Sequence, residues 1–187
     1  MAMINARKTF IEGGVYHVYN RGNNIGDIFF DEEDFNVFIW LVQRYLTVQV
    51  VTHVKNYSDR INLLAFCLKP THFHFLLQQK DRSAMTEFMH SFLISFTAYI
   101  NNKYGRVGHL FQGIYKGRFI RSDNDLTWTS RYIHRNGGVS KEEILTYPYS
   151  SIGVYLGKRL NYSFVNSSLV LSLFGYSKKL YEEYLED

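Results

Sequence analysis

Two histidines spaced two residues apart, His72 and His74, lie in the apolar segment 68–77 and could hold a metal ion. Side chains on an extended strand alternate between the two faces, so both imidazoles point to the same side. Two nitrogens from one rigid strand supply half of a metal site. The simpler alternative is a pair of hydrogen-bonded histidines that bind no metal.

Tyr132 and Asn136 are four residues apart in a segment of helical character, so they share one helix face. Asn136 offers an amide oxygen to an ion, and Tyr132 places a phenol beside whatever the ion holds. A divalent cation on a phosphate oxygen would polarise the target of a tyrosine nucleophile. The implied chemistry is phosphoryl transfer from a phosphodiester to tyrosine. The alternatives are a core tyrosine and an asparagine that only ends a helix.

The elements that must position these residues follow from hydrophobic periodicity. Strands are predicted at 15–20, 61–68, 72–79 and 115–121; helices are predicted after an Asp31 cap, after a Ser83 cap as far as 103, and from Asp123 or Asp125 to Arg135. The order β-α-β-β-α-β predicts an α+β, ferredoxin-like (split βαβ) antiparallel sheet with helices on one face. In that topology the histidine strand is central, beside the strand that carries His17.

Length and composition favour one globular domain. We expect a catalytic domain over residues 1–139 and a C-terminal helical extension over residues 140–187, packed on the same domain. Cys67 is the only cysteine, which excludes a disulfide framework and a cysteine-based zinc site. The N-terminus lacks the apolar stretch of a signal peptide, and no run is long enough to cross a bilayer. These features predict a cytoplasmic protein with no membrane partner.

Positive charge is concentrated between Lys103 and Arg135, a stretch that holds seven of the 21 Lys and Arg residues and only two acidic residues. His109, Phe111, Tyr115 and Trp128 are interspersed with these charges. A cationic, aromatic surface suits a polyanion with stackable bases, such as a nucleic acid. Taken alone, the same stretch also fits an ordinary solvated basic surface.

Six motifs run in order along nearly the whole chain. They are YHVYNRGN at 16–23, CLKPTHFHFLL at 67–77, GHLFQG at 108–113, RYIHRN at 131–136, YPYSS at 147–151 and VLSLFG at 170–175. Together they resemble the HUH single-tyrosine transposases of insertion sequences, and especially the REP-associated tyrosine transposases. The combination is far more specific than the pair of histidines alone.

The resemblance implies a transposase-like enzyme that cuts and rejoins single-stranded DNA through a 5′-phosphotyrosine intermediate at a hairpin-containing end. By resemblance, His72, His74 and Asn136 bind Mg²⁺ or Mn²⁺, and Tyr132 is the nucleophile. Exchange of two strands calls for two tyrosines, which predicts a homodimer. The alternative is a catalytically inactive, domesticated protein that binds single-stranded nucleic acid.

Two departures from the family pattern bear on activity. Thr71 stands where the family usually has asparagine before the first histidine, and Gly137 stands where proline usually follows the helix. Neither change removes a ligand or the nucleophile. Gly137 should leave the end of the helix freer than proline would.

We expect four cations to contact backbone phosphates and two loop residues to contact bases. The phosphate candidates are Arg21, Lys116, Arg118 and Arg121, and the base candidates are His109 and Phe111. His17 has three open roles: support of a metal ligand from the second shell, a DNA contact, or a buried hydrogen-bonded residue.

Three rival functions make different predictions. A metal-free module that binds RNA or single-stranded DNA on its sheet would lose nothing on Tyr132→Phe. A phosphoesterase with paired H-x-Ser/Thr motifs is excluded, because none of the seven histidines has Ser or Thr two places on. A purely structural protein leaves the linked motifs unexplained.

Overall fold

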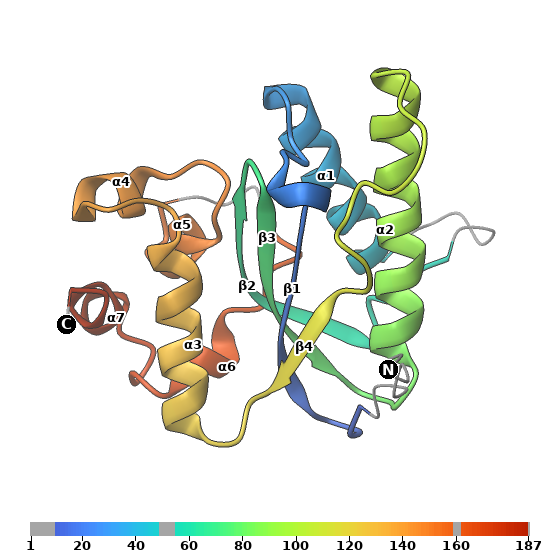
Figure 1. The fold of residues 1–187 in the computed structure, drawn as a ribbon. Coiled ribbons are helices and arrows are strands. Elements are labelled where there is room, and N and C mark those ends of the chain that lie inside the picture. Colours follow the sequence, from blue (N-terminus) through green and yellow to red (C-terminus); the bar gives the residue numbers. More distant parts are fainter. Residues whose placement is uncertain (1–9, 49–54, 159–161, 187) are drawn as a thin grey trace, which may run out of the picture.

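A computed structural model describes residues 10–48, 55–158 and 162–186 of the chain (Figure 1). The strands are β1 (Val15–Arg21), β2 (Ile61–Lys69), β3 (His72–Gln79) and β4 (Lys116–Phe119). The helices are α1 (Glu32–Leu46), α2 (Ala84–Lys103), α3 (Asp123–Arg135), α4 (Lys141–Thr146), α5 (Ile152–Tyr155), α6 (Ser168–Ser172) and α7 (Lys178–Tyr184), with a short 3₁₀ turn at Asn23–Ile25. The antiparallel sheet has the order β2-β3-β1-β4, which confirms the predicted split βαβ, ferredoxin-like fold.

Strand β3 is central, between β2 and β1, as the sequence predicts. The tight connection from Lys69 to His72 makes β2 and β3 a hairpin, with Cys67 opposite His74. On the other side Tyr19 lies opposite His74. A central strand is held by hydrogen bonds along both edges, so it fixes its side chains rigidly.

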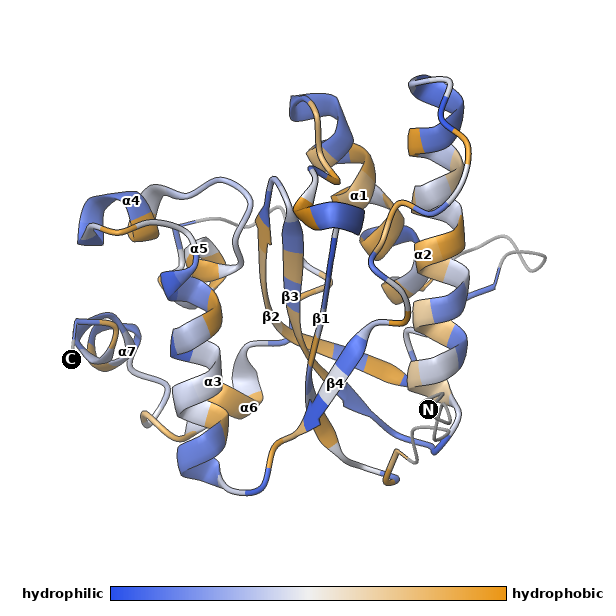
Figure 2. Ribbon diagram, viewed as in Figure 1, coloured by the Kyte–Doolittle hydropathy of each residue, from blue (hydrophilic) through white to orange (hydrophobic). Residues whose placement is uncertain are grey.

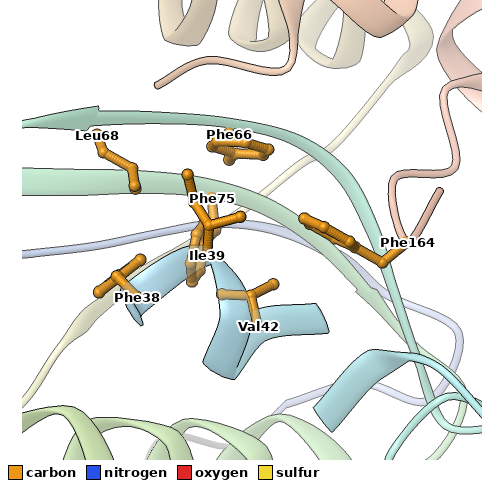
Figure 3. Close-up of a pocket in the computed structure, with 7 residues that line it drawn as sticks. All are labelled: Phe38, Ile39, Val42, Phe66, Leu68, Phe75 and Phe164. Carbon is orange, nitrogen blue, oxygen red and sulfur yellow. The ribbon is translucent and has the colours of Figure 1, made fainter. Parts of the chain in front are cut away.

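Helices α1 and α2 cover one face of the sheet, on the right in Figure 1. Phe38 of α1 meets the rings of Phe92 and Phe96 of α2 edge to face, at centroid distances of 4.7 and 4.8 Å. Figure 3 shows the adjoining layer, where Phe38, Ile39 and Val42 face Phe66, Leu68 and Phe75 of the sheet, with Phe164 at its edge. Much of the chain's high aromatic content is therefore core.

The second face of the sheet is also covered, which corrects the expectation of helices on one face alone. Helix α3 packs on β2 and β3, and the C-terminal helices lie on the same side (Figure 1). Leu64, Cys67 and Leu76 of the sheet form a second buried cluster with Ile133 and Tyr155. These apolar strand residues need a cover, because burying them removes their surface from water. The edge strand β4 remains mostly hydrophilic (Figure 2).

The helix caps agree only in part with those expected. Asp31 caps α1 in a capping box with Asp34, as predicted. The Ser83 side chain makes no capping hydrogen bond to α2; the Asp81 carboxylate accepts from the backbone amides of Ser83 and Ala84 instead. The predicted cap of α3 is also wrong.

Ser122 caps α3, where Asp123 or Asp125 is predicted: its hydroxyl accepts from the Asp125 amide. Asp123 and Asp125 lie in the first turn, where their negative charge favours the helix N-terminus. Acidic residues are common at both kinds of position, so composition alone shifts the predicted cap by a residue or more.

A buried hydrogen-bond network joins α3 to the C-terminal helices. The two ring nitrogens of His134 lie 2.7 Å from the Tyr181 hydroxyl and 2.8 Å from the Ser151 hydroxyl. The Tyr181 hydroxyl also lies 3.0 Å from that of Ser130, and the Ser151 hydroxyl lies 3.2 Å from the Phe66 carbonyl of β2. Because burial keeps His134 neutral, its ring donates to one of the two hydroxyls and accepts from the other. These bonds connect α7 and the start of α5 to the helix that carries Tyr132.

Replacement of Tyr181 by phenylalanine is expected to destabilise the protein by about 1–3 kcal/mol, because it leaves buried polar groups of His134 and Ser130 without their partner. Urea unfolding measures the change. Tyr184→Phe on the same helix is the matched control and should stay within about 0.5 kcal/mol of the parent. Equal stability of the two variants would show that the network contributes nothing.

No helix among the described residues is long and apolar enough to cross a membrane. The segment 1–9, on which the expectation of no signal peptide rests, lies outside the described residues.

Candidate active site

His72 and His74 lie side by side on β3, with their ring centroids 5.1 Å apart. His74 is 6% exposed, and its Nδ1 lies 2.9 Å from Nε2 of His17 on the neighbouring strand. The Nδ1 of His72 lies 2.9 Å from the Thr71 hydroxyl. Each histidine of the pair therefore has its Nδ1 engaged by another side chain of the protein, and its Nε2 is directed away from that partner.

The three histidines are held in their neutral form. Burial lowers the pKa of His74 to about 3, assisted by His17 and His72, and burial lowers the pKa of His17 to about 4, assisted by Arg118. Burial also lowers the pKa of His72. A neutral imidazole has a lone pair, so these groups can ligate a metal at neutral pH without first losing a proton.

The same shifts make folding sensitive to acid. Below about pH 6.5 the unfolded chain takes up protons on its histidines, while His17 at about 4 and His74 and His134 at about 3 stay neutral in the folded chain. Stability is therefore complete above pH 6.5 and is lost as the pH falls toward 4. Urea unfolding of the metal-free protein should show a lower midpoint at pH 5 than at pH 7.5.

The control for that prediction is His109→Gln, an exposed histidine whose loss should not alter the pH profile. His134→Gln should make the profile shallower, because a group that takes up a proton only on unfolding has been removed. An equal midpoint at the two pH values would contradict the assignment of neutral buried histidines.

Tyr132 projects from α3 toward this pair. Its ring centroid lies 5.6 Å from that of His74 and 5.7 Å from that of His17, with both rings edge-on. The phenol is 39% exposed, so a substrate can reach it. Leu126 and Ile133 of α3 are buried in the cluster that α3 forms with the sheet. This orientation of the helix leaves Tyr132 partly exposed.

Asn136 ends α3 beside the same histidines. Its amide donates to the Tyr132 carbonyl at 2.7 Å, and its side chain also hydrogen-bonds His72, which raises the pKa of His72 against the effect of burial. Glycine suits position 137, because the Cβ of any larger residue there would lie 3.0 Å from Cβ of Tyr147. The Gly137 amide also donates to the His134 carbonyl, a bond that proline could not make. The end of the helix is therefore packed closely against Tyr147.

The donor set fits a divalent cation that leaves open positions. His72 and His74 can each offer Nε2, and Asn136 can offer its amide oxygen once its hydrogen bond to His72 gives way. No group of three or more His, Cys, Asp or Glu residues suited to a metal occurs in the described part of the chain. With His72, His74 and Asn136 as its protein donors, a cation would keep open positions for oxygens from substrate or water.

The four side chains predicted to contact phosphates differ in whether they are already bonded within the protein. Lys116 and Arg121 are exposed, and Arg21 is exposed with its guanidinium bonded to Gln112. Arg118 forms an ion pair with Asp125 at 2.9 Å and donates to Thr129 at 2.6 Å. Arg118 thus joins β4 to α3, which limits its freedom to follow a DNA backbone.

The two residues predicted to contact bases differ in their exposure. His109 is exposed, on a loop that borders a cavity of about 730 Å³ beside α2. Phe111 is only 8% exposed, and its ring packs against Phe73 and Phe96. Most of this ring therefore belongs to the core, and only its edge on the same cavity is left for the expected base contact.

Two residues near the site were not assigned to it from the sequence. Tyr19 lies with its ring centroid 5.8 Å from that of His74, and Trp128 stacks on Tyr132 at 5.5 Å with ring planes 8° apart. Their spacing in the sequence indicates a shared face in each case: Tyr19 lies two residues from His17 on a strand, and Trp128 lies one helical turn before Tyr132. Thr71, seen only as a departure from a motif, supports His72.

The chain resembles known proteins in sequence and in fold. Residues 41–136 match the profile of the family described as IS200-like transposase. Among solved structures, the REP-associated tyrosine transposase bound to a REP hairpin is similar, with a TM-score of 0.61 and 18% identity over 83% of this chain and 87% of that one. A candidate transposase from Deinococcus radiodurans R1 gives a TM-score of 0.44 at 12% identity, over 70% of this chain and 95% of that one. No curated protein matches the chain.

Proposed function

Because the chain belongs to the IS200-like transposase family, we propose that it cuts and rejoins single-stranded DNA through Tyr132. The observation that carries this proposal is the position of an exposed tyrosine against a neutral, prearranged pair of histidines. An exposed phenol gives access to a strand, and the histidine pair gives a place for the phosphate's counter-ion.

In the proposed reaction the Tyr132 hydroxyl attacks the scissile phosphorus. A bond forms between the tyrosine oxygen and phosphorus while the bond to the 3′ oxygen breaks. The tyrosine loses its proton to solvent, and the departing 3′ oxygen gains one. The product is a 5′-phosphotyrosine and a free 3′ hydroxyl, which reverses the step on another strand.

We assign the cation site to His72, His74 and Asn136, with Mg²⁺ or Mn²⁺ as the ion. Bound there, the ion would offset negative charge on the phosphate oxygens. His17 and Thr71 orient the two imidazoles through Nδ1, and Asn136 holds the end of α3 through the Tyr132 carbonyl. These contacts preorganise the chain's own groups before substrate arrives.

The DNA is proposed to be a single strand with a hairpin. This rests on the solved neighbour that is described as bound to a REP hairpin, and on exposed cations such as Arg21, which lies opposite His72 in the sheet. Arg21, Lys116 and Arg121 are the phosphate contacts we favour, with Arg118 in a supporting role and His109 at the bases.

A homodimer is part of the same proposal, because one tyrosine holds one 5′ end and an exchange of two ends needs two. We also propose that residues 1–139 carry the chemistry and that residues 140–187 are an extension that supports α3. The hydrogen bonds of Tyr181 and Ser151 with His134 favour that support.

The direct test is incubation with Mn²⁺ or Mg²⁺ and hairpin DNA from the sequence that flanks the gene, followed by a denaturing gel. A protein–DNA band that forms only with the ion supports the proposed reaction. Tight binding of this DNA without cleavage under either ion would favour the alternative of an inactive binder.

His17→Ala is expected to weaken Mn²⁺ binding by about 10- to 100-fold, since His74 loses the partner that orients it. Mn²⁺ affinity can be measured by titration calorimetry on the protein without DNA. His109→Ala is the matched control and should bind Mn²⁺ as the parent does. An unchanged affinity in His17→Ala would remove His17 from the support of the metal site.

A further inference from the structure

Trp128 is a large apolar side chain that the fold leaves in water. It is 54% exposed, although α3 buries Leu126, Thr129, Ser130 and Ile133 against the rest of the protein. Its ring is stacked on that of Tyr132, nearly parallel at 8°. The tyrosine therefore lies against one face of the indole, and no ring or cation contact is found on the opposite face among the described residues.

We propose that the free face of Trp128 is a platform for an unpaired nucleobase adjacent to the scissile phosphate. The proposal rests on the proposed function, since it places that base beside the tyrosine that attacks. A base on this face would continue the stack that Tyr132 and Trp128 begin. Its own phosphate would then lie near the Tyr132 hydroxyl.

The chemistry of the surroundings selects this occupant. Arg118 of β4 donates to Thr129, the residue after Trp128, and the exposed Lys116 lies over the ring of Tyr19, which is beside His74. A planar aromatic ring with cations on the neighbouring strand matches a nucleic-acid strand, which has flat bases and a charged backbone. The bases of a duplex are already stacked on each other, so only an unpaired base can use this platform.

A different role for Trp128 is support of Tyr132 alone. That role predicts a loss of cleavage with no change in DNA affinity. The platform predicts a loss of affinity even when cleavage cannot occur. The test therefore measures binding in EDTA with Tyr132→Phe protein.

The chain has two tryptophans, so Trp40→Phe leaves Trp128 as the only indole. Trp40 lies on α1 and its ring contacts Arg44, outside the proposed site. The double variant with Tyr132→Phe is titrated with a DNA hairpin that carries an unpaired tail from the flank of the gene. Tryptophan fluorescence reports contact at Trp128, and anisotropy of a dye on the DNA reports binding.

Binding is expected to quench the tryptophan emission, and the same hairpin with an abasic tail should quench far less. Trp128→Ala in the Tyr132→Phe protein should weaken binding of the tailed hairpin by about 5- to 150-fold. Trp128→Phe keeps an aromatic face and should restore most of that loss. Far-ultraviolet circular dichroism checks that each variant is folded, as the exposure of Trp128 leads us to expect.

Three results would overturn the platform: binding without quenching, unchanged affinity in Trp128→Ala, or no binding of the tailed hairpin. Failure of the proposed function is a separate outcome. Quenching and tight binding with no covalent product from the protein that retains Tyr132 would leave the platform in place and refute the cleavage reaction. Cleavage by the parent protein without quenching would support the cleavage reaction and refute the platform.

Discussion

Replacement of Tyr132 by phenylalanine is expected to reduce formation of the covalent protein–DNA product by at least about 10⁴-fold, because the attacking oxygen is lost. The ring and its contacts with His74, His17 and Trp128 are retained, so folding and DNA binding should change little. The measurement is the rate at which a labelled hairpin becomes attached to the protein in Mn²⁺.

The sharpest control is Tyr19→Phe. Tyr19 is the other tyrosine at the site, and its ring lies about as close to His74 as that of Tyr132, at 5.8 Å against 5.6 Å. Since Tyr19 is less exposed and lies on a central strand, we expect Tyr19→Phe to keep most of the activity. Loss of the product in Tyr19→Phe, with the product kept in Tyr132→Phe, would exchange the roles of the two tyrosines.

Removal of a metal ligand has the second large effect. His74→Ala is expected to lower the cleavage rate by at least about 10³-fold, because a bound cation contributes several kcal/mol of charge stabilisation and each 1.36 kcal/mol is a factor of ten. EDTA should have the same effect on the parent protein, reversed by excess Mn²⁺. Single-turnover cleavage of the hairpin over a series of Mn²⁺ concentrations measures both.

His90→Ala serves as the control, because His90 lies on α2, on the side of the sheet away from the site. His74 is also buried, so circular dichroism must show that the alanine variant is folded. His72→Ala offers an independent route, since His72 is more exposed than His74. Full cleavage by a folded His72→Ala or His74→Ala variant, or by the parent in EDTA, would contradict a metal-dependent reaction.

The central part of this site is local enough to be read from the sequence. Alternation places His72 and His74 on one side of a strand, and helical spacing places Tyr132 and Asn136 on one side of a helix. The short turn before His72 fixes the hairpin, and the order of elements then makes β3 central. Each of these inferences needs only the spacing of nearby residues.

Contacts between distant segments could not be obtained in this way. The position of α3 against the second face depends on Cys67 and Leu76 meeting Ile133, which no local pattern specifies. Phe111 follows His109 in a cationic stretch, which favours a base contact, but in the structure its ring packs beside Phe73. Aromatic residues serve cores and stacking surfaces equally well, so only burial separates the two roles.

His17 illustrates how a pairing resolves an ambiguous residue. From the sequence it had three open roles, and strand register alone did not fix its partner. The structure places its Nε2 at 2.9 Å from Nδ1 of His74 and buries it, which leaves little surface for a DNA contact. Support of His74 remains the role that its hydrogen bond favours.

The covalent bond between Tyr132 and DNA is the central step of the proposed reaction. The most direct measurement is mass spectrometry of the protein–DNA product after nuclease and trypsin digestion. Trypsin should release the tetrapeptide Tyr132–Arg135, because arginine precedes and ends it. We expect a 5′-phosphonucleotide on this tyrosine, formed only with Mn²⁺ or Mg²⁺. A nucleotide on any other of the 15 tyrosines, or none on an intact protein that binds the hairpin, would contradict the account.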